Sequence, residues 1–120
     1  MARMTNKKDL VKELGKTQFY EITNAKIASF DIFIENHGIL TSFVDIDYGN
    51  SRQGYGGYSH IGERKYTLVD TVLGLLAITD SLKIDQIAGE PIRVFLKDDG
   101  FYRKIVAIGH YLEDKWFTFD

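Results

Sequence analysis

The segment Arg52–Tyr58, with the sequence RQGYGGY, combines residue types that can recognise a ring-shaped, charged ligand. Tyr55 and Tyr58 can stack on a base, and Arg52 can contact a phosphate or cover a ring through a cation–π contact. Glycine inside a strand marks a bulge, or a place where a backbone or a ligand comes close. A bulged strand whose tyrosines simply pack explains the same pattern, so both interpretations stay open.

Further cations could add a phosphate contact. Arg64 and Lys65 come just before an expected helix start at Thr67, where free N–H groups favour an anion, although a solvated loop is the simpler interpretation of these two cations. Arg103 is expected opposite Arg93 on a C-terminal hairpin, and facing cations repel unless an anion or a carboxylate lies between them. The candidate ligand-binding residues are Arg52, Gln53, Tyr55, Tyr58, Arg64, Lys65 and Arg103.

The sequence argues against catalysis and against a metal or cofactor. The glycine segment lacks the Gly-Lys-Ser/Thr ending of a phosphate-binding loop and the spacing of a dinucleotide fingerprint. There is no cysteine, and the three histidines form no compact ligand pair. Ser59 and His60 are adjacent in an expected strand and so point to opposite faces. Asp45 and Asp47 share a strand face, but a solvent-facing pair explains them. We therefore expect no enzyme, no metal and no cofactor.

Length and composition predict one cytoplasmic domain. The chain has 120 residues, 44% of them hydrophobic, which is enough for a single core. The net charge of −2 gives no overall positive field for nucleic acid or anionic lipid. No signal peptide and no run of roughly 18 apolar residues is present, so no membrane contact is expected. We assign residues 1–18 to an N-terminal extension with a short helix and residues 19–120 to the core.

Hydrophobic periodicity predicts an α+β fold whose sheet is mostly antiparallel. Strands within 19–60 form a three-strand meander, and a separate hairpin follows at 92–108 around the turn at 98–100. A main core helix is expected over 67–80, and a short helix over 6–15 between the N-cap Asn6 and a stop at Gly15. The aromatic tail that ends the chain is expected to pack or to form an interface, and an interface of this kind would lie across a two-fold axis of a homo-oligomer.

Several motifs occur in an order that resembles a family of small uncharacterised proteins encoded by phages and prophages. The resemblance covers roughly residues 20–118 and rests on the segments ITNAKI (22–27), HGILT (37–41), DIDYG (45–49), QGYGGY (53–58), VAIGH (106–110) and DKWF (114–117). Small phage proteins of this kind include inhibitors of host immunity, among them anti-Thoeris sponges that sequester cyclic ADP-ribose signals as oligomers. No ligand-binding residue of those sponges matches a position in this chain.

The resemblance therefore implies an anti-defence protein that acts in the host cytoplasm, and three classes of function remain. The first is capture of a small nucleotide signal by the candidate residues above. The second is a protein-blocking inhibitor of a host defence complex, such as an anti-CRISPR, which would present its acidic balance and its aromatic residues to a basic channel. The third is a structural or DNA-handling accessory of the phage.

Overall fold

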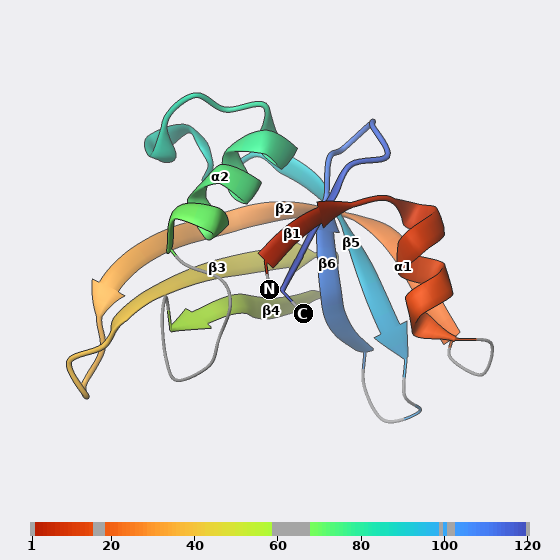
Figure 1. Cartoon of the computed structure of the whole chain (residues 1–120), viewed down its shortest axis with the longest axis horizontal. Coiled ribbons are helices and arrows are strands. Elements are labelled where there is room, and N and C mark those ends of the chain that lie inside the picture. The colour runs from red at the N-terminus through yellow and green to blue at the C-terminus, as the bar shows by residue number, and fades with distance from the viewer. Residues whose placement is uncertain (1, 16–18, 59–67, 99, 101–102, 120) are drawn as a thin grey trace.

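The computed structural model describes residues 2–15, 19–58, 68–98, 100 and 103–119 (Figure 1). Seven strands and two α-helices follow one another along this part of the chain. The elements are β1 (Ala2–Thr5), α1 (Lys7–Leu14), β2 (Phe19–Ile34), β3 (Leu40–Tyr48), β4 (Ser51–Tyr58), α2 (Leu68–Thr79), the 3-10 turn η1 (Ile84–Gln86), β5 (Pro91–Asp98), β6 (Arg103–Gly109) and β7 (Trp116–Phe119).

All seven strands belong to one sheet in the order β1-β7-β6-β5-β2-β3-β4. Every neighbouring pair is antiparallel. The predicted division into a three-strand meander and a separate hairpin is therefore wrong. The long strand β2 joins the two parts, because residues 19–26 pair with β5 and residues 26–34 pair with β3.

A β-bulge explains why the sequence did not reveal this long strand. The register of β2 against β3 shifts between Ile27 and Ser29. Before the bulge, odd-numbered residues of β2 such as Thr23 lie on the same face as the buried Val94, and after it Phe30 lies beside the buried Val44. A bulge adds one residue to one strand and so reverses the alternation of side chains. The apolar pattern of the segment is broken for this reason.

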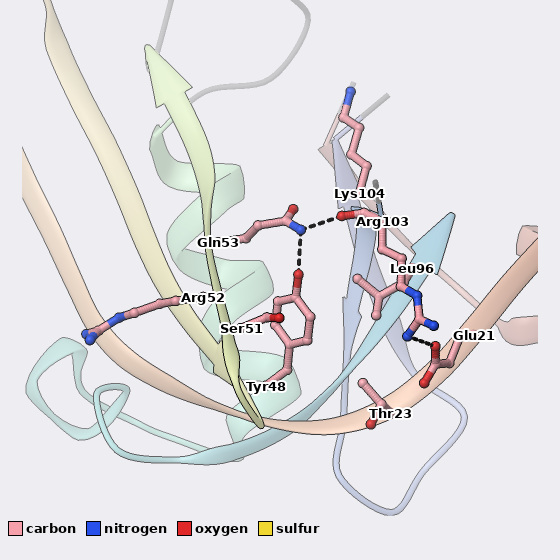
Figure 2. Close-up of a pocket in the computed structure, with 9 residues that line it drawn as sticks. All are labelled: Glu21, Thr23, Tyr48, Ser51, Arg52, Gln53, Leu96, Arg103 and Lys104. Atoms are coloured by element: carbon pink, nitrogen blue, oxygen red, sulfur yellow. Dashed lines mark hydrogen bonds and ion pairs between the residues drawn. The ribbon is translucent and has the colours of Figure 1, made fainter. Parts of the chain in front are cut away.

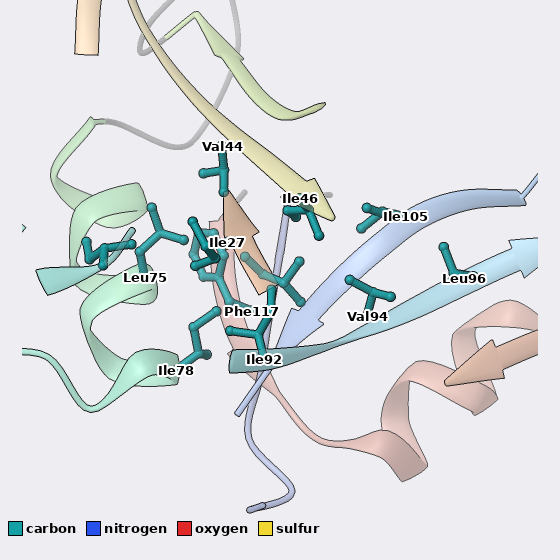
Figure 3. Packing of buried hydrophobic residues seen from close by; sticks show 12 residues of the cluster. Ile27, Val44, Ile46, Leu75, Ile78, Ile92, Val94, Leu96, Ile105 and Phe117 are labelled. Carbon is teal, nitrogen blue, oxygen red and sulfur yellow. The ribbon is translucent and has the colours of Figure 1, made fainter. Parts of the chain in front are cut away.

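Each face of the sheet is covered by one helix. Helix α2 lies on the face that we call the inner face, and α1 lies on the outer face (Figure 1). Figure 3 shows the inner cluster, which is made of aliphatic residues from the strands, from α2 and from the end of η1, with Phe117 of β7. The outer cluster is smaller and consists of Leu10, Phe95, Ala107 and Trp116.

Both helices start and end close to the predicted positions. The side chain of Asn6 accepts a hydrogen bond from the backbone N–H of Asp9 at 2.9 Å, and α1 stops at Gly15, whose φ is 85°. The predicted helix over 67–80 is α2, where Gly74 allows the ring of Phe117 to pack against the helix backbone. Its expected first residue, Thr67, lies outside the described residues.

The aromatic tail packs inside its own chain. Trp116 and Phe117 are fully buried, one in each cluster, and β7 pairs with the N-terminal strand β1. These two side chains therefore supply no surface for a second copy, and a homo-oligomer stays a prediction. None of the described helices has the length and the apolar character that crossing a membrane requires.

Candidate functional site

An open pocket of about 810 Å³ lies where the sheet curls and brings β4 close to β6 (Figure 2). It is lined by residues of β2, β4, β5 and β6 and by the end of β3. Strand pairing places Glu21 beside Leu96 and Thr23 beside Val94, so these β2 residues face inward. The lining residues are Glu21, Thr23, Tyr48, Ser51, Arg52, Gln53, Leu96, Arg103 and Lys104.

Gln53 links the two strands across this pocket. Its Nε2 donates hydrogen bonds to the backbone carbonyl of Arg103 at 2.5 Å and to the hydroxyl of Tyr48 at 2.6 Å. Its Oε1 accepts a hydrogen bond from the backbone N–H of Ile105 at 3.1 Å. We call these three contacts the Gln53 bridge. The amide that was predicted to bind a ligand is thus engaged by the protein itself.

The two arginines that reach the pocket are both paired with carboxylates. Arg103 forms an ion pair with Glu21 and lies 3.8 Å from Asp98, its partner across the hairpin. Arg52 extends away from the pocket in Figure 2, and its Nε lies 2.9 Å from a carboxylate oxygen of Asp45. Neither guanidinium is aimed into the cavity as an uncompensated charge, which weakens the expected phosphate contact.

The predicted residues are brought together only in part. Arg52, Gln53 and Arg103 line one pocket although they come from distant parts of the sequence. Tyr55 and Tyr58 lie on β4, but the structure describes only their backbone. Arg64 and Lys65 lie outside the described residues. The expected pairing of Arg103 with Arg93 is wrong, because Arg93 is opposite Gly109.

Sequence reasoning did not assign to the site the inward residues of β2 or the residues on either side of the turn between β3 and β4. The missed lining residues are Glu21, Thr23, Tyr48, Ser51, Leu96 and Lys104. Every second residue from Glu21 to Ile27 points to the same side of a strand, so the apolar Ala25 and Ile27 could have indicated that Glu21 and Thr23 face the core side as well. Nothing local in the sequence indicates that this face meets β4.

The glycine at position 54 has a packing role. A Cβ atom at Gly54 would overlap the ring of Phe43, which lies across it on the outer face. The register of β3 against β4 runs without a shift from Thr41–Tyr58 to Tyr48–Ser51. The segment is therefore a regular strand and not the bulged strand that its glycines suggested.

A second polar cluster joins the end of α2 to the β6–β7 turn. The Nδ1 atom of the buried His110 accepts hydrogen bonds from the backbone N–H groups of Leu112 and Glu113, both at 3.0 Å. Its Nε2 therefore carries the proton and donates to Asp80 at 2.5 Å. Since both ring nitrogens are occupied, this histidine–aspartate pair holds a turn in place and cannot act as a general base.

The hydrogen bond from His110 lowers the pKa of Asp80 below its usual value, outweighing a partial burial that acts in the opposite direction. The charge of Lys115 lowers the pKa of Asp80 further. Among the described residues, no group of three histidine, cysteine or acidic side chains could hold a metal ion.

Replacing Asp80 with Asn should make stability less dependent on pH in the acid range. A lowered folded-state pKa means that Asp80 stabilises the fold above its unfolded pKa of about 3.9, and that this contribution disappears as the pH falls through the folded value. Asparagine tolerates the φ of 53° at this position. Urea unfolding should show that Asp80→Asn has a lower free energy of unfolding than the unsubstituted protein at neutral pH, and that this difference shrinks toward pH 3. A loss of unfolding free energy that is the same at every pH would contradict this prediction. The control Lys115→Met removes only the weakest of the effects that lower the pKa of Asp80, so it should keep most of the pH dependence of stability.

Comparison with protein-family models, with curated proteins and with solved structures finds no match for this chain. Its function is therefore inferred from its own surface and pockets.

Proposed function

We propose that this chain is a binding protein that blocks a partner protein, and that its β2–β3 hairpin makes the central contact. Figure 1 shows the hairpin extending past α2. Five large apolar side chains near its end are between 37% and 63% exposed, and we call them the apolar hairpin end: Ile32, Phe33, Ile34, Leu40 and Phe43. This is the observation that carries the proposal, because exposed apolar groups gathered in one place mark contact surfaces.

The apolar hairpin end has apolar side chains on both of its faces. Ile34 and Leu40 are directly opposite each other on the inner face. Phe33 and Phe43 lie on the outer face, opposite Thr41 and Asp31 respectively. A hairpin that only covered a core would carry polar residues on its second face. Two apolar faces are better suited to a cleft in a partner that closes around the hairpin.

The turn of this hairpin is fixed before any partner arrives. One carboxylate oxygen of Glu35 accepts hydrogen bonds from the backbone N–H groups of His37 at 2.6 Å and Ile39 at 3.2 Å, and the other lies 2.8 Å from Nδ1 of His37. Partial burial raises the pKa of Glu35, but these bonds outweigh it and the net pKa is lowered. An ordered hairpin loses less entropy on binding and so supports tighter association.

The resemblance to phage-encoded proteins gives the proposal its biological setting. We propose a host defence complex as the class of target, with the hairpin inserted into one of its clefts. Catalysis forms no part of this proposal, since the only histidine–aspartate pair seen in the described residues is fully engaged in the fold.

Replacing Ile34 with Lys should weaken partner binding by about 30-fold, the loss expected when a contact worth about 2 kcal/mol is removed from the centre of an interface. The matched control is Leu82→Lys, which introduces the same charge at an apolar side chain that is 90% exposed elsewhere. Affinity capture of host proteins followed by titration of the captured partner measures both. If both variants lose the same amount of affinity for the partner, or if neither loses any, the proposed role of the hairpin is contradicted.

Capture of a small nucleotide is a second candidate, favoured by the mixed lining of the pocket. Tyr48, Thr23 and Ser51 offer hydroxyl groups, and Lys104 offers a cation that forms no ion pair with any described residue. The carboxylates that already pair with Arg103 count against a phosphate at that side chain. Native mass spectrometry of the freshly purified protein tests this candidate, because it weighs any bound nucleotide and reports the number of subunits together.

A further inference from the structure

Two strand edges face each other across the pocket. β4 is one of the two edge strands of the sheet, and in the described part of the chain β6 pairs with β7 through Ile108 and Gly109. Among the described residues, Arg103, Lys104 and Ile105 therefore have strand pairing on the β5 side only. Because every ladder from β6 through β5, β2 and β3 to β4 is antiparallel, β4 and β6 run in the same direction.

The Gln53 bridge occupies the hydrogen-bonding groups that another strand would use. The side-chain amide donates to the carbonyl of Arg103 and accepts from the N–H of Ile105, the two backbone groups that flank Lys104. A residue of a neighbouring strand in a parallel ladder bonds to the same two groups. The edge of β6 is thus satisfied by one side chain in place of a strand.

The reach of the Gln53 side chain sets the scale of the gap. A glutamine side chain and one hydrogen bond together span roughly 8–10 Å between strands, and paired strands lie about 4.8 Å apart, so one strand inserted midway would pair with both edges. Since β4 and β6 are parallel, an inserted strand antiparallel to both would continue the alternation of the whole sheet.

The surroundings of the gap specify the side chains of such a strand. Leu96 and the ring of Tyr48 lie on the inner side, where an apolar side chain would pack. On the outer side Lys97 and Lys104 are directly opposite each other, and neither forms an ion pair with a described residue. Like charges in this position destabilise a sheet, and a carboxylate beside them would relieve the repulsion.

We propose that the gap between β4 and β6 binds an extended segment of a partner protein as an added strand, with apolar residues facing inward and acidic residues facing Lys97 and Lys104. The inference rests on the proposed function, since it names how the blocked protein would be held at a second place. Backbone hydrogen bonds supply the affinity in this mode, and alternate side chains supply the specificity. The side chain of Gln53 swings out as the strand enters.

The test uses the full chain and two capped octapeptides, one alternating valine with glutamate and the other alternating valine with lysine. Fluorescence anisotropy should show that the acidic peptide binds at least about tenfold more tightly, and that Lys104→Glu weakens it by about tenfold. The control Lys83→Glu changes an exposed lysine far from the gap and should leave binding unchanged. Gln53→Ala should tighten binding severalfold, because it removes the side chain that competes for β6.

Each outcome decides the inference. No binding of the acidic peptide, equal binding of both peptides, or indifference to Lys104→Glu would overturn it, and release of a nucleotide from the pocket would assign the pocket to the second candidate function. Ile34→Lys should leave peptide binding intact. If the hairpin variant still abolishes partner capture while the peptides fail to bind, the added strand is wrong and the proposed function stands. If the peptides bind as expected while the hairpin variant has no effect on capture, the added strand stands and the role of the hairpin in the proposed function is wrong.

Discussion

Trp116→Ala is expected to lower the free energy of unfolding by about 3–5 kcal/mol, the usual loss when a large buried aromatic side chain is removed. Trp116 is 1% exposed and meets Phe95 edge-on, with ring centroids 6.0 Å apart. The guanidinium of Arg93 lies 5.0 Å from the centre of the indole ring, and Nε1 donates to Asp114. The substitution would leave a cavity under α1 and would loosen the pairing of β7 with β1.

Urea unfolding followed by circular dichroism measures this loss, with Leu112→Ala as the control. Leu112 lies in the same β6–β7 segment and is 80% exposed, so its truncation should change stability by less than about 0.5 kcal/mol. Because a domain of this size is stable by about 5–15 kcal/mol, the loss at Trp116 is a large share of the total. A loss below about 1 kcal/mol would show that the outer cluster does not anchor the terminal strands.

Structural features that depend on residues close together in the sequence could be predicted from it. Asn6 and Gly15 delimit α1 because a cap and a stop act within one turn of a helix. The β5–β6 hairpin was recognised from its turn around Gly100, whose φ of 95° and bond to the side chain of Asp98 are local properties. Patterns with a short range were sufficient for these elements.

Features set by irregular pairing were not accessible. The bulge after Ile27 reverses the side-chain alternation of β2, and the register shift between Phe95 and Leu96 places Arg93 opposite Gly109. Each shift involves a single residue, yet it changes which side chains share a face along the rest of the strand. Arg93 instead donates hydrogen bonds to the backbone carbonyls of His110 and Glu113, a structural role that residue type alone does not indicate.

Three of the seven predicted site residues line one pocket, but the contacts that they make were not predicted. Arg52, Gln53 and Arg103 do line one pocket, since glycine-rich and basic segments mark places where the chain is unusual. Their roles depend on partners that are remote in the sequence. Glu21 and Asp45 neutralise the two arginines, and the amide of Gln53 finds its acceptor 50 residues away. Polar side chains that look available for a ligand can be used first by the fold.

Gln53→Leu is expected to lower the free energy of unfolding by about 1–3 kcal/mol, because it removes three hydrogen bonds while keeping the side-chain size. The hydroxyl of Tyr48, the carbonyl of Arg103 and the N–H of Ile105 lose their shared partner. The bonds are only partly buried, so water replaces some of them and the loss stays below that of a fully buried network.

Hydrogen exchange distinguishes the bridge from a general loss of stability. The amide of Ile105 should exchange much faster in Gln53→Leu, whereas amides of β2 paired to β5 should change only with global stability. In Gln53→Glu the exchange rate of the Ile105 amide should lie between those of the original protein and Gln53→Leu. A carboxylate still accepts hydrogen bonds from Ile105 and Tyr48 but cannot donate one to the carbonyl of Arg103. Asn24→Leu replaces an exposed amide on β2 and serves as the control. If the amide of Ile105 stays protected in Gln53→Leu, then another group closes the edge of β6, and the gap between β4 and β6 is not open to an added strand.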